Sequence, residues 1–425
     1  MKKFLPVIAI LLFTAAGFLF GYGLRDTMRG HLPDYSRLSL LFGKDSNEKE
    51  TLEPVRAFTT VLGSIDAAFY GDIDKEKILY AGIEGYLSAL NDPYTELLKP
   101  SEAETFEERN KGRFTTTGGI GAELGRDPIG ARIKRVFKNS PASMAGIQPD
   151  DVIVKVNGNA VSGRNLEDVV KEIRGEEGTK VTLTIFRETT QTTMDLTLTR
   201  KKVSIQDVYA DILNADYTID KPKVGRLEVR SFSETISQQF DEELAWLENQ
   251  GIKGLIIDLR GNPGGVLRSA VEMCSRFFER QLVTKMKRRD GASEPYFAPS
   301  GNAKKRNYPI VILVDEGSAS AAEIFAGALR DYKLATIVGE HTYGKAAVQQ
   351  VWDLNGGARL KLTIGRYYLP NGESIARIQD NQGNYLGGGI KPDIEVILEK
   401  GVSPGDIAKD NQLKKAYEVI VEKVR

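Results

Sequence analysis

The spacing of apolar residues changes character along the chain. From Leu52 to about Arg109, apolar positions recur with the helical period, as in VRAFTTVLGSIDAAFY, which is typical of amphipathic helices. From Phe114 to about Thr199, short alternating runs such as KVTLTIFR predict strands, with two helical pieces between them. From Val203 onward, apolar strands alternate with helical stretches. We therefore expect a helical domain, a compact β-rich domain and a larger α/β domain.

The α/β pattern also predicts where chemistry would lie. Its strands GLIIDLR, PIVILVD and LATIVGE are separated by helical stretches, which is typical of a largely parallel sheet with crossover helices. Ligands of such sheets gather at the carboxyl ends of the strands. Three loops follow these ends, at 260–265, 315–320 and 340–349. We expect the functional residues among them.

The N-terminus predicts a membrane anchor or an export signal. The stretch from Phe4 to Leu24 carries no charge, which fits a retained anchor of about 20 residues. Small residues at 15–17 also allow cleavage as a signal peptide. Both alternatives place the rest of the chain outside the cytoplasm. The expected spans are an anchor or signal at 1–25, a linker at 26–50, a helical domain at 51–112, a β-rich domain at 113–200 and an α/β domain at 201–425.

The composition argues against several classes of function. The chain has 58 basic and 58 acidic residues, so it lacks the overall positive field that attracts nucleic acids. Its basic runs at 285–289 and 304–306 are expected in solvated loops. Cys274 is the only cysteine, which rules out an intrachain disulfide and a cysteine-rich metal site. Only His31 and His341 are available for histidine chemistry.

Each of the three loops has a structural and a chemical interpretation. GEHTYGKA at 339–346 resembles a phosphate-binding loop around Lys345, but Ala346 stands where the magnesium-binding Ser or Thr is needed. Ser320 and Glu323 form a capping-box pattern, although a serine at a helix start could equally be a nucleophile. Ser318 is as plausible by position. Glycines in GNPGG could supply backbone N–H groups for an oxyanion or simply make a tight turn.

Taken together, these loops resemble one family. DLRGNPGG, GSASAAEI and GEHTYGKAAVQ are similar to the motifs of the carboxyl-terminal processing peptidases, and the resemblance runs from about Leu90 to about Val396. It implies serine endopeptidases that cleave proteins near their C-termini, with a crotonase- or Clp-protease-like α/β core, an inserted PDZ domain, and no metal or other cofactor. Together with the N-terminal segment, we expect a location on the periplasmic side of an inner membrane.

The resemblance assigns a role to each site residue. Ser320 matches the nucleophile, Lys345 the general base and Gln349 the residue that orients the lysine. The oxyanion donors would be the N–H of Ala321 and that of Gly264 or Gly265, two alternatives that stay open. Ser318 then becomes a turn residue. Three positions depart from the family pattern, namely Asp315 in place of Asn, His341 in place of Pro and Ala346 in place of Gly.

Elementary chemistry agrees with a lysine base. Histidines are scarce, and burial can lower the pKa of a lysine from about 10.4 towards 7–8, where the neutral amine can accept a proton. His341 is the competing base. A helix after Gly344 would place Gln349 on the same face as Lys345.

The β-rich module resembles a PDZ domain. Its turn GGIGAEL lacks the glycine at 124 that a dinucleotide loop requires. The N–H groups of Gly119, Ile120 and Gly121 could instead hold a substrate's C-terminus. Expected partners are therefore protein or peptide substrates, an activator or adaptor protein, and a second copy joined through the helices at 52–109, but no nucleic acid. The rival function is a catalytically silent PDZ adaptor.

Overall fold

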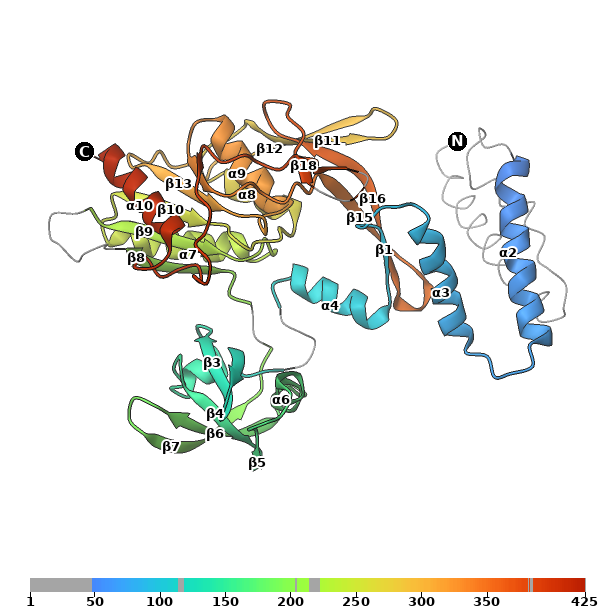
Figure 1. Ribbon diagram of the computed structural model, residues 1–425, viewed down its shortest axis with the longest axis horizontal. Helices are drawn as coiled ribbons and strands as arrows, with labels where there is room; N and C mark the ends of the chain where they lie inside the picture. Colours follow the sequence, from blue (N-terminus) through green and yellow to red (C-terminus); the bar gives the residue numbers. More distant parts are fainter. Residues whose placement is uncertain are drawn as a thin grey trace, which may run out of the picture. The chain divides into compact units, whose positions relative to one another are not determined.

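The computed structural model describes residues 48–113, 118–202, 205–213, 222–380, 382 and 385–424. The chain divides into two compact units, residues 1–83 and 84–425. Helix α2 (Glu48–Ala68) lies in the first unit, and α3 (Lys75–Ser88) spans the division (Figure 1).

The predicted anchor or signal at 1–25 and nearly all of the linker at 26–50 lie outside the described residues. Within the described part of the chain, no helix combines the length and the apolar character that crossing a bilayer requires.

The segment predicted as a helical domain at 51–112 contains a short strand near its C-terminal end. Strand β1 (Glu96–Leu98) pairs antiparallel with β16 (Arg359–Tyr368), so this segment belongs to the second unit. Helix α4 (Pro100–Asn110) follows, with Pro100 at its first position, where the missing N–H is not needed. The apolar pair in β1 is buried by a partner more than 250 residues away. Local spacing does not reveal such a partner.

Residues 118–202 form the predicted small β domain. Its sheet has the antiparallel order β2-β3-β4-β6-β7, with β5 beside β4. In β6, Val181, Leu183 and Ile185 are buried and alternate with more exposed residues, as the sequence predicted. The elements are β2 (Ala122–Asp127), β3 (Gly130–Val136), α5 (Pro141–Met144), β4 (Val152–Val156), β5 (Asn159–Ala160), α6 (Leu166–Ile173), β6 (Lys180–Arg187) and β7 (Thr192–Thr199).

The α/β domain is built on a six-stranded sheet in the order β19-β14-β13-β10-β9-β8. All neighbouring strands are parallel except β8 and β9, as the alternation predicted. The elements are β8 (Val208–Leu213), β9 (Val224–Val229), α7 (Ile236–Asn249), β10 (Gly254–Asp258), α8 (Leu267–Cys274), β13 (Ile310–Val314), α9 (Ala321–Asp331), β14 (Thr336–Gly339), β19 (Ile394–Glu395) and α10 (Asn411–Val424).

Helices cover both faces of this sheet, which explains why its central strands are apolar throughout (Figure 1). Leu255 and Ile257 of β10 belong to the core formed with α7, α8 and α9. Between them, Ile256 points to the other face and joins the core formed with Leu413 and Ile420 of α10. Cys274 is buried in the first of these cores, so it fills space there.

A second sheet has β16 at its centre. Strand β15 (Ala347–Asp353) pairs along one side of β16, and β1 and β11 (Leu282–Arg288) pair with it as well. The predicted loop at 285–289 is therefore wrong for 285–288, which lie in β11. Met286 is buried there between exposed lysines. The remaining elements are β12 (Ser293–Phe297), η2 (Asn355–Gly357), β17 (Ile378–Gln379) and β18 (Tyr385–Gly387).

Candidate active site

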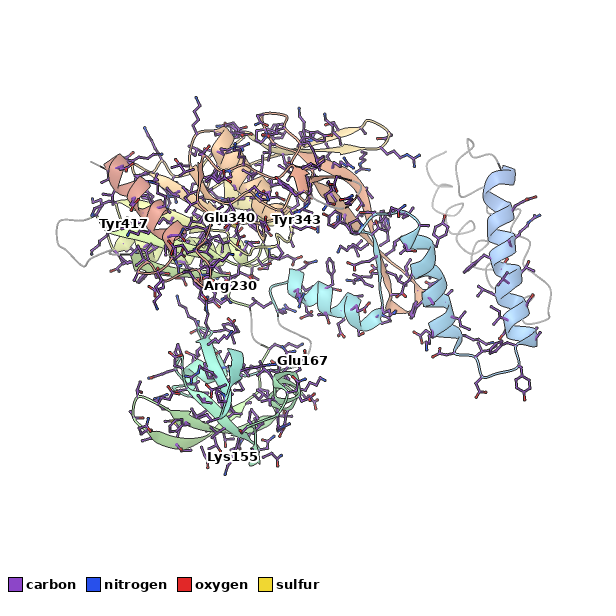
Figure 2. The ribbon with its side chains drawn as sticks, viewed as in Figure 1. Lys155, Glu167, Arg230, Glu340, Tyr343 and Tyr417 are labelled. Atoms are coloured by element: carbon purple, nitrogen blue, oxygen red, sulfur yellow. The ribbon has the colours of Figure 1, made fainter. Side chains whose placement is uncertain are left out.

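The three predicted loops meet at one edge of the parallel sheet, because β10, β13 and β14 run in the same direction. Contacts between the loops are direct. Ser318 donates its hydroxyl to the Leu259 carbonyl at 2.8 Å, and the Tyr343 N–H donates to the Ser318 carbonyl at 2.9 Å. Figure 2 labels Tyr343 and Glu340 on the segment between β14 and β15. Ser318 is fully buried in this junction, which agrees with its interpretation as a turn residue.

Ser320 lies immediately before α9 in an unusual backbone conformation, with φ 55° and ψ −114°. A side chain other than glycine is strained at positive φ, and such strain is typical of a nucleophile displayed on a sharp strand-to-helix turn. Its N–H donates to Glu323 Oε2 at 2.7 Å, which is the glutamate half of the predicted capping box.

Glu323 joins the nucleophile turn to the lysine loop. Its Oε2 also accepts the Lys345 N–H at 2.9 Å, while Oε1 accepts the Gly344 N–H at 2.7 Å and the Thr342 hydroxyl at 2.5 Å. Burial raises the pKa of Glu323, and these donors act in the opposite direction. Because all four groups donate, the carboxylate form satisfies them best. One buried side chain thus fixes the backbone of both Ser320 and Lys345.

Lys345 is half-buried, and its surroundings favour the neutral amine. Burial lowers the pKa of Lys345, and the positive charge of Lys361 lowers it further. The carboxylates of Glu96, Asp92 and Glu323 act in the opposite direction without reversing the shift. A lysine with a lowered pKa is suited to accept a proton, which is the property that the sequence interpretation required.

Gln349 lies four residues after Lys345, but not on a helix. The helix that would place both side chains on one face does not form, because residues 347–353 form β15 and pair with β16. The Gln349 Nε2 is buried and has no hydrogen-bond partner among the described residues. An unpaired buried amide needs an explanation, and a role beside the lysine is one.

The glycine loop lies against the nucleophile turn. A Cβ on Gly264 would come within 2.7 Å of the Ala319 carbonyl oxygen and 2.8 Å of Ser320 Cβ. The Gly264 N–H already donates to Asn262 Oδ1 at 2.8 Å. For the N–H groups of Gly265 and Ala321, no acceptor is found in the described part of the chain. Of the two open glycine alternatives, Gly265 is therefore the one whose N–H has no internal acceptor among the described residues.

This loop is anchored to the C-terminal helix, a link that the sequence interpretation missed. Arg260 donates to both oxygens of Asp258, and its Nη2 lies 2.8 Å from a carboxylate oxygen of Asp410, just before α10. Burial alone would lower the pKa of Arg260, but the two carboxylates raise it. Nothing in the local sequence marked Asp410 as a partner of this loop.

His341 packs against an aromatic ring. Its ring stacks on Tyr385 with centroids 4.3 Å apart, and its Nε2 lies 3.2 Å from Glu316 Oε1. The Nε2 forms no hydrogen bond among the described residues, so the stacking on Tyr385 is the contact that holds the imidazole.

In the β-rich domain, the three predicted carboxylate donors differ. The Gly119 N–H donates to the Lys201 carbonyl at 2.8 Å, so it is not free to bind a substrate. For the N–H groups of Ile120 and Gly121, no acceptor is found within the described ranges. A cavity of about 500 Å³ lies where β2 ends beside α6, lined in part by Arg126, Arg164 and Val169.

Comparison with known proteins decides the family. The carboxy-terminal processing protease CtpB of Bacillus subtilis (strain 168) is 31% identical over 416 residues, covering 97% of this chain and 82% of that protein. The family description "Peptidase family S41" matches residues 223–396. The chain belongs to peptidase family S41. A PDZ domain is matched at residues 132–187, inside the predicted span of 113–200.

Further S41 relatives agree. The "Probable CtpA-like serine protease" of Staphylococcus aureus (strain N315) is 34% identical over 359 residues, covering 84% of this chain and 67% of that protein. A solved structure titled "Putative S41 protease from Bacteroides fragilis NCTC 9343" shares the fold, with a TM-score of 0.52 at 18% identity, covering 84% of this chain and 92% of its own. This member of family S41 is thus a serine-type peptidase with a PDZ domain.

Proposed function

We propose that this S41 peptidase cleaves protein substrates by a Ser-Lys mechanism. Neutral Lys345 takes the proton of the Ser320 hydroxyl as the oxygen attacks the scissile carbonyl. The oxyanion that forms accepts hydrogen bonds from the N–H groups of Ala321 and Gly265. Lys345 then gives the proton to the leaving amine, and water hydrolyses the acyl-enzyme. Gln349 orients the lysine.

One observation carries this proposal. The Glu323 carboxylate accepts a hydrogen bond from the backbone of Ser320 at 2.7 Å and from that of Lys345 at 2.9 Å. The two residues are 25 positions apart in the sequence, and their loops follow different strands. A serine that only capped α9 would not need a half-buried lysine fixed by the same carboxylate.

We further propose that the PDZ domain binds the substrate's C-terminus through the N–H groups of Ile120 and Gly121. Their freedom from internal acceptors supports this role, and the peptide would add as a strand beside them. The uncharged stretch at 4–24 supports a periplasmic location and an inner-membrane anchor or cleaved signal. We also propose that an activator or adaptor protein binds this chain and that the chain associates with a second copy of itself.

Labelling with a serine-directed fluorophosphonate tests the mechanism. Purified protein should become labelled at Ser320, and peptide mapping by mass spectrometry should find no label on Ser318. Ser320→Ala should be neither labelled nor active. A protein that binds peptides through its PDZ domain yet never reacts at Ser320 would instead be a silent adaptor.

A further inference from the structure

Tyr94 places an aromatic ring against the lysine that is proposed as the base. The Lys345 Nζ lies 4.9 Å from the centroid of this ring. A lysine ammonium within about 6 Å of an aromatic centroid is attracted to the negative face of the ring. Tyr94 belongs to the segment before β1, far from both loops in the sequence, and none of the three strand-end loops contains it.

The position of Tyr94 is fixed by its backbone. Asp92 Oδ1 accepts the Tyr94 N–H at 3.1 Å, and Oδ2 accepts the Thr95 hydroxyl at 2.6 Å. The Thr95 Oγ1 in turn accepts the Thr363 N–H of β16 at 3.1 Å. The turn is therefore tied to the central strand of the second sheet. The backbone that carries the ring is thus held by bonds that do not involve Lys345.

The phenol of Tyr94 is not itself an acid or base. Burial raises its pKa, and the hydrogen bond with Tyr343 raises it further, so Tyr94 stays neutral in the working range of pH. Tyr343 also donates its backbone N–H to Ser318 in the nucleophile turn. The contribution of Tyr94 to the site is therefore its ring and its contact with Tyr343.

We propose that Tyr94 is a positioning residue for Lys345, which rests on the Ser-Lys mechanism given above. The ring holds the Nζ in the site and stabilises the ammonium that forms once the serine proton has moved to it. A carboxylate in this place would raise the pKa of Lys345 and keep the lysine protonated before the reaction. An uncharged ring favours the cation more weakly, so the resting lysine can still be neutral.

The carboxylates near Lys345 have other partners, so the ring can contribute to stabilising the ammonium. Lys361 lowers the pKa of Lys345, while Glu96, Asp92 and Glu323 raise it. Glu96 is itself paired with the Lys361 Nζ at 2.6 Å. Glu323 is occupied by four donors and Asp92 by its own turn. None of these carboxylates needs the ammonium as its partner.

The test is the pH dependence of kcat/KM for the wild type, Tyr94→Leu and Tyr94→Phe. Removing the ring removes a stabiliser of the cation, so the pKa of Lys345 falls. The acid limb of the profile is the pH range in which protonation of Lys345 removes activity. This limb should then move to lower pH by roughly 0.5 to 1.5 units. Because the Nζ is held less firmly, kcat should fall as well, while KM stays near its wild-type value. Tyr94→Phe keeps the ring and should keep the limb.

A second lysine–tyrosine pair supplies a matched control. The Lys287 Nζ lies 4.1 Å from the centroid of the Tyr368 ring, on the same sheet. Tyr368→Leu removes a pair of the same kind and should leave the acid limb in place. A wild-type limb in folded Tyr94→Leu would overturn the proposal and leave Tyr94 a packing residue.

Fluorinated phenylalanines at position 94 keep the proposal testable if Tyr94→Leu does not fold. Each added fluorine weakens the negative face of the ring and hardly changes its shape. The acid limb should move stepwise to lower pH along the series, and an unmoved limb would overturn the proposal. Failure of the Ser-Lys mechanism is distinguished by Lys345→Ala, which would then remain active whatever stands at 94.

Discussion

Replacing Glu323 with glutamine tests the link between nucleophile and base. The carboxylate accepts four hydrogen bonds, two on each oxygen, and is fully buried. A glutamine keeps one acceptor oxygen and turns an NH₂ group towards two of the four donors. A buried donor without an acceptor costs about 1–3 kcal/mol. Glu323→Gln should therefore lower the free energy of unfolding by about 2–6 kcal/mol, out of roughly 5–15 kcal/mol for a typical domain.

The loss of activity should exceed the loss of folded protein. Release of either oxygen frees the backbone of Ser320 or of the lysine loop, and misplacement of about 1 Å can slow a reaction about 100-fold. We would measure unfolding in urea and then the rate of fluorophosphonate labelling at a temperature where the variant is folded. Glu242→Gln on α7 is the control, because Glu242 is exposed and accepts from Gln238 on the surface. Wild-type stability and labelling in Glu323→Gln would refute the reasoning.

Three further outcomes are expected. Ser318→Ala should slow cleavage without abolishing it, because the lost hydroxyl bridges the Leu259 carbonyl and the Asp315 N–H but does not react; complete inactivity of folded protein would contradict this. Peptides with a free C-terminus should be cleaved faster than their amidated twins, and equal rates would count against PDZ binding of the carboxylate. Burial raises the pKa of Asp207 to about 6, although Ser233 and Arg230 act against it. The folded state therefore holds a proton that the unfolded state releases above about pH 4, and stability falls as pH rises from about 4 to 6, by at most about 3 kcal/mol. Asp207→Asn should remove this part of the pH dependence in urea unfolding, and an unchanged slope would exclude Asp207 as its source.

The sequence predicted the elements whose patterns are local. The strands of the parallel sheet are apolar throughout because helices cover both faces, so β10 and β13 stand out as continuous apolar runs. Order along the chain then fixes which loops meet, whereas Ser320 and Lys345 were named from the resemblance to the peptidase family. Glu323 was visible only as half of a capping box, since its bonds to the lysine loop depend on tertiary packing.

The sequence patterns did not predict those features that depend on contacts with residues far along the chain. Strand β1 lies in a region of helical spacing and becomes a strand because β16 accepts it. The sequence predicts a charged loop at 285–288, although Met286 between two lysines shows the alternation of a strand with one buried face. Tyr94 and Asp410 reach the site only through the turn before β1 and the start of α10. No spacing in the sequence joins either residue to the catalytic loops.

The central claim is that Lys345 is the proton acceptor. Single-turnover cleavage of one peptide should be followed for Lys345→Ala, Lys345→Arg and His341→Ala across about pH 5 to 10. Both lysine variants should be inactive, because a guanidinium with a pKa above about 12 cannot accept the serine proton. His341→Ala should keep most of its activity, since its ring is packed against Tyr385. Activity that survives in Lys345→Arg, or disappears in His341→Ala while Lys345 is intact, would contradict the assignment.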